Sequence, residues 1–145
     1  MSLESNKALL RRFIAESNKG MAASITVIDE LYATDIIFHN SRGEDIRGLK
    51  DFRQYNSAFL KSVPDAHFSI DDMIAEGDMV ATRWTMTGTH TGVSPSGIPA
   101  TNRKLTISAI TIDRIVGGKI VEEWERSDTL GVMQQLGVVP AIGKS

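Results

Sequence analysis

The sequence of 145 residues contains no cysteine, few prolines and no surplus of basic residues. Without cysteine the chain can form no disulfide framework, no thiolate metal site and no cysteine nucleophile. Its 16 Lys and Arg are balanced by 18 Asp and Glu, so the formal net charge is −2. Because a protein that binds nucleic acid usually carries excess positive charge, we expect no nucleic-acid partner.

Long hydrophobic runs are also missing. No apolar stretch approaches membrane-spanning length, and residues 1–7 lack the basic and then apolar pattern of a signal peptide. We therefore expect no membrane partner and a cytoplasmic location. The three histidines, His39, His67 and His90, are far apart in the sequence, so no metal site is expected. Neither a glycine-rich phosphate loop nor a Gly-x-Ser-x-Gly motif occurs.

What is present is typical of a globular protein. The composition is 41% hydrophobic and 23% charged, and the length leaves no room for a second sizeable core. We therefore interpret residues 1–145 as a single domain.

The first half of the chain is predicted to be mainly helical. Leu9, Leu10, Phe13 and Ile14 have helical spacing, and helical patterns recur over residues 21–32 and 49–63, the last ending before Pro64. The β-branched and aromatic run 35–39 predicts a strand, and the polar residues 40–48 predict a loop.

The second half is predicted to consist of strands. The expected segments are strands from residue 65 to 76 and 79 to 90, a loop over 91–102, a strand to Val116, a Gly117–Gly118 hairpin, a strand over 120–127 and a helix over 129–136. Helices that precede a run of hairpin-linked strands indicate an α+β protein. We expect N-terminal helices packed on a curved antiparallel or mixed sheet, with a conical pocket between them.

The last strand carries the most informative pattern. Uniform alternation would point Ile120, Glu122, Trp124, Arg126 and Asp128 to one face, and Val121, Glu123, Glu125 and Ser127 to the other. The first set mixes an indole with charges of both signs, which favours the wall of a partly dry pocket. The second set is mostly polar and is expected to face solvent or a wet subunit contact.

Asp128 has two interpretations. A carboxylate near an indole in a dry pocket has a raised pKa, which suits it to move protons near neutral pH. Asp128 also immediately precedes the predicted terminal helix, where Asp is a preferred N-cap. The spacing leaves both roles open. For Glu122, we expect an ion pair with Arg126 or Arg114.

Other candidate site residues lie at strand ends or within strands. His39 and His90 each end a predicted strand, and His90 opens the loop over 91–102. Arg83 and Arg114 lie within β-like runs, where each could be a surface residue or could bind an oxyanion in the pocket. Arg83 and Trp84 must point to opposite faces of their strand, and the sequence does not say which one points inward.

Several motifs resemble those of the SnoaL-like polyketide cyclase (ester cyclase) family. They are Phe38–Asn40, Arg47–Gly48, Pro64–Asp65, Glu76–Asp78, Arg83–Trp84, Gly88–Gly92, Gly97–Arg103, Arg114, Gly118–Trp124, Asp128 and Gln135–Gly137. Ala100 and Asn102 depart from the proline and glycine more common in that family. The resemblance implies the conical α+β fold of the nuclear-transport-factor-2-like superfamily, commonly assembled as homodimers or higher oligomers.

The resemblance also implies an activity. Characterised cyclases of this family close a ring by intramolecular aldol condensation, with one aspartate as acid and base and no metal or organic cofactor. That aspartate corresponds to Asp128, and His39, Arg83, His90 and Trp124 fall on motif positions expected at the pocket. With Arg114 and Glu122, these residues form the predicted binding site for a small hydrophobic, carbonyl-containing ligand.

Two alternatives remain open. The same cavity could bind a small ligand without chemistry, or the scaffold could host an isomerase, a dehydratase or an epoxide hydrolase.

Overall fold

The computed structural model describes residues 2–140 and contains helices α1 to α4 and strands β1 to β6. In chain order they are α1 (Leu3–Ser17), α2 (Met21–Leu31), β1 (Tyr32–His39), β2 (Asp45–Arg47), α3 (Leu49–Ser62), β3 (His67–Glu76), β4 (Met79–Thr89), β5 (Lys104–Val116), β6 (Lys119–Ser127) and α4 (Thr129–Gln135). The predicted order of helices and long strands is confirmed. The short strand β2, which lies in the predicted loop over 40–48, was not anticipated.

The strands form one mixed sheet with the order β2-β1-β6-β5-β4-β3. Strands β3 to β6 are successive antiparallel neighbours, whereas β1 pairs with β6 in parallel. The parallel pair arises because the chain leaves β1, forms β2 and α3 and the β3–β5 meander, and only then returns beside β1. The predicted α+β fold with a mixed sheet is therefore confirmed.

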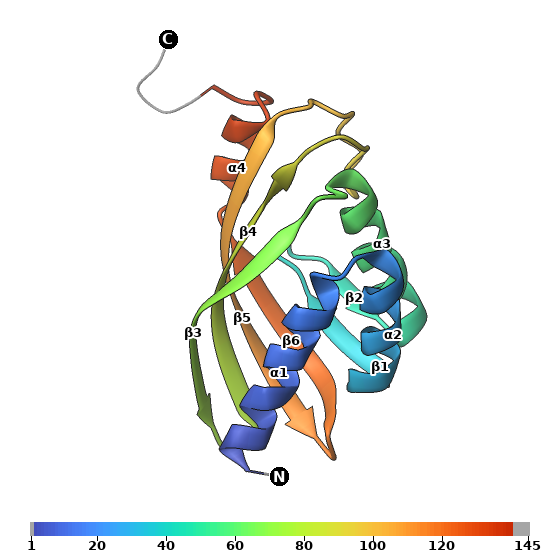
Figure 1. Ribbon diagram of the computed structural model, residues 1–145, viewed down its shortest axis with the longest axis vertical. Helices are drawn as coiled ribbons and strands as arrows, with labels where there is room; N and C mark the ends of the chain where they lie inside the picture. Colours follow the sequence, from blue (N-terminus) through green and yellow to red (C-terminus); the bar gives the residue numbers. More distant parts are fainter. Residues whose placement is uncertain (1, 141–145) are drawn as a thin grey trace.

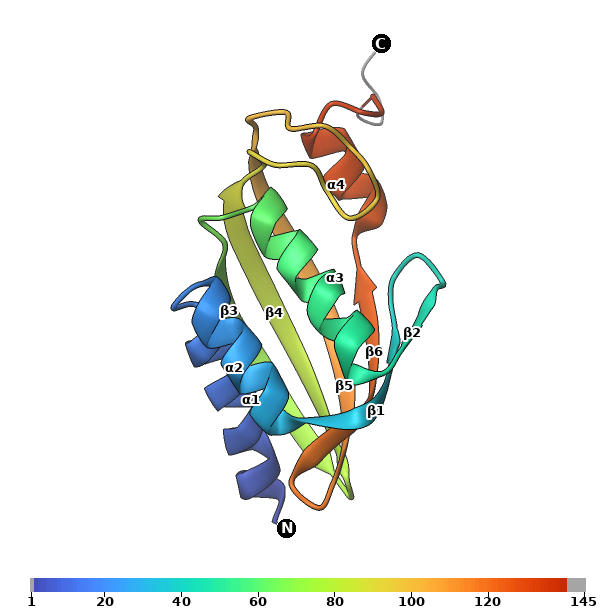
Figure 2. The same cartoon turned by 90° about the vertical axis from the view of Figure 1, so that its right-hand side faces the viewer.

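The helices cover the inner face of the curved sheet. Figure 1 shows α1 crossing in front of the strands, and Figure 2 shows α3 lying over the sheet with α4 and the β4–β5 loop at one end. Ser2 caps α1 by accepting a hydrogen bond from the Ser5 N–H at 3.0 Å. Asn18, at the end of α1, exchanges two hydrogen bonds with the backbone of Phe68 and so fixes the helix to β3.

Two buried hydrophobic clusters lie between the helices and the inner face of the sheet. The larger one contains the packed aromatic rings of Tyr32, Phe38 and Phe52, with neighbouring ring centroids 4.5 and 5.4 Å apart. The smaller cluster surrounds Met86 and Leu105 near α4. Apolar side chains from the helices and the sheet therefore pack together in two parts of the interior.

A β-bulge in β6 determines which of its residues face the interior. Ile115 pairs with Ile120, but the preceding residue, Arg114, pairs with Glu122, so Val121 is the extra residue. After this bulge, Glu123 faces inward beside Asp113, while Glu122 faces outward. The predicted assignment of the two faces of the last strand was wrong, because it assumed uniform alternation from Ile120.

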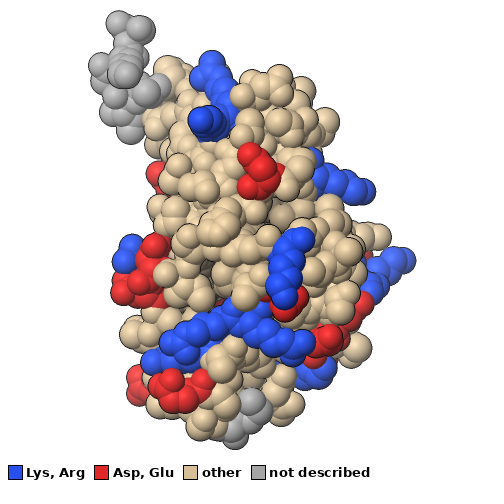
Figure 3. All heavy atoms as spheres, in the orientation of Figure 1, with Lys and Arg blue, Asp and Glu red and all other residues tan. Residues whose placement is uncertain are grey.

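Among the described residues, no helix is both long and apolar enough to span a membrane. On the face drawn in Figure 3, acidic and basic side chains lie next to one another rather than in a patch of one sign. This mixed surface agrees with the nearly balanced charge of the sequence.

The β4–β5 loop is fixed against the end of α3 by its backbone. The N–H groups of Thr91 and Gly92 both donate to the Ser62 carbonyl at 3.0 Å. A Cβ atom at Gly92 would lie 2.3 Å from the Lys61 carbonyl oxygen, so only glycine allows this approach.

Gly92→Ala should therefore destabilise the protein, because the loop backbone must move away from α3. We expect a loss of about 1–3 kcal/mol in the free energy of unfolding, measured by urea denaturation. Thr91→Ala, which changes an exposed neighbour, is the matched control. Equal stability of the two variants would contradict the proposed contact.

Candidate functional site

A cavity of about 230 Å³ lies between the inner face of the sheet and the helices. Its walls come from α1, α3, α4, the sheet and the β4–β5 loop. Lining residues with polar groups include Ser41, Arg42, Tyr55, Asn56, Trp84, His90, Thr111, Asp113, Glu123, Glu125 and Ser127. The remaining lining is largely hydrophobic, as in a typical small-molecule site.

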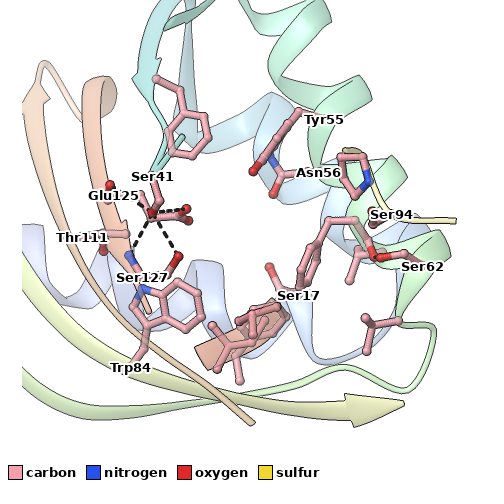
Figure 4. Close-up of a pocket in the computed structure, with 18 of the residues that line it drawn as sticks. Ser17, Ser41, Tyr55, Asn56, Ser62, Trp84, Ser94, Thr111, Glu125 and Ser127 are labelled. Carbon is pink, nitrogen blue, oxygen red and sulfur yellow. Dashed lines mark hydrogen bonds between the residues drawn. The ribbon is translucent and has the colours of Figure 1, made fainter. Parts of the chain in front are cut away.

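Ser41 is the centre of a hydrogen-bond group on one wall. Its hydroxyl accepts from the Ser127 N–H at 2.8 Å and lies 3.0 Å from the Ser127 hydroxyl. The same hydroxyl donates toward Glu125, whose carbonyl and carboxyl Oε1 both lie at 3.3 Å. Figure 4 shows this group on one side of the cavity. Ser41 thus joins the segment after β1 to the end of β6.

Glu125 is the carboxyl group best placed to exchange protons in this cavity. Burial and the nearby negative charge of Glu123 raise its pKa to about 7, although Ser41 and two arginines, Arg126 and Arg42, oppose this. A group with this pKa is partly protonated and partly ionised near neutral pH. Glu125 can therefore both accept and return a proton.

Two further acids that line the cavity, Asp113 and Glu123, lie near Glu125. Asp113 and Glu123 are register partners on β5 and β6, and both are buried. The Tyr32 hydroxyl donates to Glu123 Oε1 at 2.9 Å. Burial raises the pKa of Asp113 well above its ordinary value, and the charge of Glu123 adds to this effect.

The opposite wall presents hydrogen-bonding groups from α3. Figure 4 shows Tyr55 and Asn56 pointing from α3 into the space that faces Glu125. Burial raises the pKa of Tyr55 to about 12, so its phenol stays protonated and can donate a hydrogen bond. Trp84 of β4 forms part of the floor. The open question about Arg83 and Trp84 is answered, since Trp84 is the residue that faces inward.

Of the seven site residues predicted from the sequence, only His90 lines the cavity. It is 1% exposed, and its Nδ1 accepts a hydrogen bond from the Thr101 N–H at 3.2 Å. Because a backbone N–H can only donate, Nδ1 is unprotonated and the ring proton is on Nε2. Nε2 is buried and has no hydrogen-bond partner among residues 2–140.

Asp128 is exposed and does not line the cavity. Its carboxylate accepts the Gly131 N–H at 2.9 Å and caps α4. The capping role that the sequence left open is therefore present. The expected placement of this carboxylate in a dry hollow beside Trp124 was wrong, because the bulge turns Trp124 to the outer face and Asp128 follows the last inward residue of β6.

His39, Glu122 and Trp124 form a cluster on the outer face. The His39 ring stacks on Trp124 with centroids 5.4 Å apart. His39 Nε2 lies 2.7 Å from Glu122 and Nδ1 lies 2.7 Å from Asp45, and the Glu122 contact is the main cause that raises the pKa of His39. The partner of Glu122 is therefore His39 rather than the predicted Arg126 or Arg114.

The two predicted arginines also lie outside the cavity. Arg114 pairs with Asp78 at 3.1 Å, and its guanidinium lies 6.0 Å from the Trp124 ring centroid. Arg83 is exposed and pairs with Asp72 at 2.5 Å. Neither arginine is placed to bind an oxyanion in the cavity.

Sequence reasoning missed the carboxyl wall of Asp113, Glu123 and Glu125. A signal was available in β5, where Leu105, Ile107 and Ala109 alternate with polar or exposed residues and place Asp113 on the same face. This pattern groups Asp113 with apolar residues, but the opposite face of β5 carries Ile110, Ile112 and Val116, so alternation does not by itself identify the inner face. In the described part of the chain, no three His, Asp or Glu side chains are grouped so that they could hold a metal ion.

Comparison with known proteins places this architecture in a family. The family described as SnoaL-like polyketide cyclase matches residues 8–136. The chain belongs to the SnoaL-like polyketide cyclase family. The resemblance read from its motifs is thus confirmed. No curated protein matches the chain.

Solved structures agree with this assignment. A SnoaL-like polyketide cyclase, so named, from Jannaschia sp. CCS1 is 18% identical, with a TM-score of 0.86 and 94% of each chain covered. AclR from Streptomyces galilaeus, named a hydroxylase, is 26% identical, with a TM-score of 0.82 and coverage of 99% of this chain and 87% of that one. IdmH from Streptomyces antibioticus, named a polyketide cyclase, is 25% identical, with a TM-score of 0.76 and coverage of 91% and 98%. Solved structures that share this fold therefore carry different activity names.

The raised pKa of Asp113 predicts how stability depends on pH. Folding makes Asp113 hold its proton more tightly, so its contribution to stability is complete below the unfolded pKa of about 4 and is lost as the pH rises toward the folded pKa. Because asparagine does not ionise, Asp113→Asn should remove the loss of stability that occurs as the pH rises.

The variant should therefore gain stability relative to the wild type as the pH rises above about 4, the ordinary pKa of an aspartate in the unfolded chain. Urea denaturation at several pH values measures the difference, and Asp35→Asn on the exposed part of β1 is the control. Parallel stability curves for the wild type and Asp113→Asn would contradict the burial of an acid at this position.

Proposed function

We propose that the protein is a cofactor-independent enzyme that cyclises a small carbonyl-rich substrate by an intramolecular aldol reaction. The observation that carries this proposal is the half-buried carboxyl group of Glu125 in a largely apolar cavity, with a pKa of about 7. The name of the family and the names of its solved members support a ring-closing reaction on a carbonyl compound. A cavity of about 230 Å³ limits the substrate to a small molecule.

The proposed reaction begins with ionised Glu125. Its carboxylate removes a proton from a carbon flanked by two carbonyl groups, which breaks a C–H bond and forms an enolate. The enolate carbon attacks a second carbonyl of the same molecule, forming the C–C bond and leaving an alkoxide. Protonated Glu125 then returns its proton to that alkoxide. One carboxyl group near neutral pKa serves both steps.

Developing negative charge on the substrate oxygen needs a hydrogen-bond donor. Tyr55 faces Glu125 across the cavity, and its phenol remains protonated at neutral pH. A donor that is already oriented in a dry site stabilises an enolate more than water does. The walls also hold the flexible substrate folded, which brings the two reacting carbons together.

The family resemblance assigns the acid and base role to Asp128, and this remains a prediction. Asp128 is exposed and occupied as a helix cap, so a catalytic role would require α4 to shift at its first turn. Glu125 needs no such movement. An experiment must therefore compare the two residues directly.

Glu125→Gln should slow the exchange of the acidic methylene protons of ethyl benzoylacetate with deuterated water. The substitution keeps the shape of the side chain but removes the base, so we expect the protein-catalysed exchange rate to fall about a hundredfold or more. Proton NMR follows the exchange, and Asp128→Asn is measured in parallel.

The outcomes separate the candidates. If only Glu125→Gln loses the catalysed proton exchange, Glu125 is the acid and base. If only Asp128→Asn loses it, Asp128 has that role. A wild-type protein that binds this ester without accelerating exchange would favour the second candidate function, a small-ligand-binding protein. The exposed position of Asp128 is the observation that favours that alternative.

We also propose that two copies associate through the outer face of the sheet. Every second residue of β5 points outward there, and Ile110 and Ile112 are 49% and 37% exposed. Trp124 of β6 lies on the same face as the register partner of Ile112. Burial of these side chains between two subunits would remove apolar surface from water.

Ile112→Lys should therefore convert a dimer into a monomer, since a buried lysine at the contact would lack a partner. Light scattering at micromolar concentration measures the mass of the wild type and the variant. Ile74→Lys, at an exposed position on β3, is the control. A monomeric wild-type protein would contradict this assembly.

A further inference from the structure

Three titratable side chains lie behind Glu125 and take no part in the proposed reaction. Tyr32 starts β1, Asp113 lies on β5, and Glu123 lies on β6 two residues before Glu125. Asp113 and Glu123 are direct register partners, and the Tyr32 hydroxyl donates to Glu123 at 2.9 Å. We call these three side chains the acid trio.

The acid trio is nearly closed to water, although Asp113 and Glu123 are among the residues that line the cavity. Tyr32, Asp113 and Glu123 are 2%, 1% and 8% exposed, and both carboxyl oxygens of Asp113 are closed to water. Glu125 also lines the cavity, where it lies beside Ser41 (Figure 4). The trio can therefore act on chemistry through the charge that it presents to Glu125.

The members of the trio are not equivalent. Glu123 receives a hydrogen bond from the Tyr32 hydroxyl, which stabilises a carboxylate at that position. Neither oxygen of Asp113 has a hydrogen-bond partner among residues 2–140. Two facing carboxylates in a closed interior cannot both remain ionised at low cost. The geometry therefore assigns the negative charge to Glu123 and the proton to Asp113.

The charge on Glu123 is close to Glu125. Residues two apart on a strand point to the same face and are separated by about 6–7 Å. The other charged groups near Glu125 are Arg126, its neighbour on β6, and Arg42 in the β1–β2 loop. Arg42 is exposed and already paired with Glu44 at 3.0 Å. Glu123 is therefore the fully buried charge among these neighbours.

We propose that Tyr32, Asp113 and Glu123 form a positioning group that holds one fixed negative charge behind Glu125 and so makes Glu125 the proton acceptor of the cavity. In this arrangement the Tyr32 hydrogen bond opposes the rise that burial causes in the pKa of Glu123, so Glu123 gives up its proton more readily than Asp113 beside it. The catalytic use of this effect rests on the proposed function. The electrostatic effect itself does not, and it can be measured without any substrate.

The test is a titration of Glu125 by carbon NMR, with the side-chain carboxyl of glutamate labelled and the Glu125 signal assigned from Glu125→Gln. Three variants alter the trio conservatively. Glu123→Gln removes the charge, Tyr32→Phe removes the donor that stabilises it, and Asp113→Asn replaces the protonated acid with a neutral amide. Amide correlation spectra establish that each variant is folded.

We expect the midpoint of the Glu125 titration to fall by about one pH unit in Glu123→Gln, because an interacting negative charge is lost. Tyr32→Phe should lower it in the same direction, because Glu123 then takes up a proton. Asp113→Asn should leave it unchanged, since the charge on Glu123 remains. Ser41→Ala is the control of opposite sign, because loss of its hydrogen bond to Glu125 should raise the midpoint.

An unchanged midpoint in Glu123→Gln would overturn the proposal, and so would an equal shift in all three trio variants, which would indicate a general loosening of the site. If Glu123→Gln does not fold, Tyr32→Phe decides the matter, because it deletes only one oxygen atom. A different result would refute the proposed function instead. If the Glu125 midpoint shifts in Glu123→Gln but proton exchange on ethyl benzoylacetate is as fast as in the wild type, the positioning role of the trio stands and the aldol reaction does not.

Discussion

The burial of a row of carboxyl groups inside an apolar cone is the constraint on which the rest of this structure depends. Asp113, Glu123 and Glu125 all point into the interior, where water is scarce and a lone carboxylate is costly. The protein meets that cost in three ways: a phenol hydrogen bond to Glu123, a seryl hydroxyl on Glu125, and proton uptake by the acids. The near-neutral pKa of Glu125 is thus a direct consequence of where these side chains lie.

The bulge at Val121 determines that placement. Without one extra residue in β6, Glu122 and Trp124 would face the cavity, while Glu123 and Glu125 would be on the outside. The same bulge places Trp124 on the outer face, where its ring stacks on that of His39. A single local irregularity therefore separates an inner surface suited to acid–base chemistry from an outer surface suited to association.

Helical spacing, the stop at Pro64 and the Gly117–Gly118 hairpin were sufficient to predict the α+β architecture, because each depends on local sequence. The family was also recognisable from its motifs. The site was predicted poorly, since strand alternation gives the relative direction of two residues but not which face is inside. A bulge has no clear sequence signature, and the pairing of Asp113 with Glu123 depends on register between strands. Asp128 was ambiguous because one residue type serves both as a helix cap and as a catalytic acid.

The central claim is that Glu125 changes its protonation state near neutral pH inside the cavity. Infrared difference spectroscopy between about pH 5 and about pH 9 tests this most directly, because a protonated carboxyl has a distinct carbonyl stretching band. We expect a band that is present at the lower pH, disappears with a midpoint near 7, and is missing from Glu125→Gln. A difference spectrum that is identical for the wild type and Glu125→Gln would contradict it.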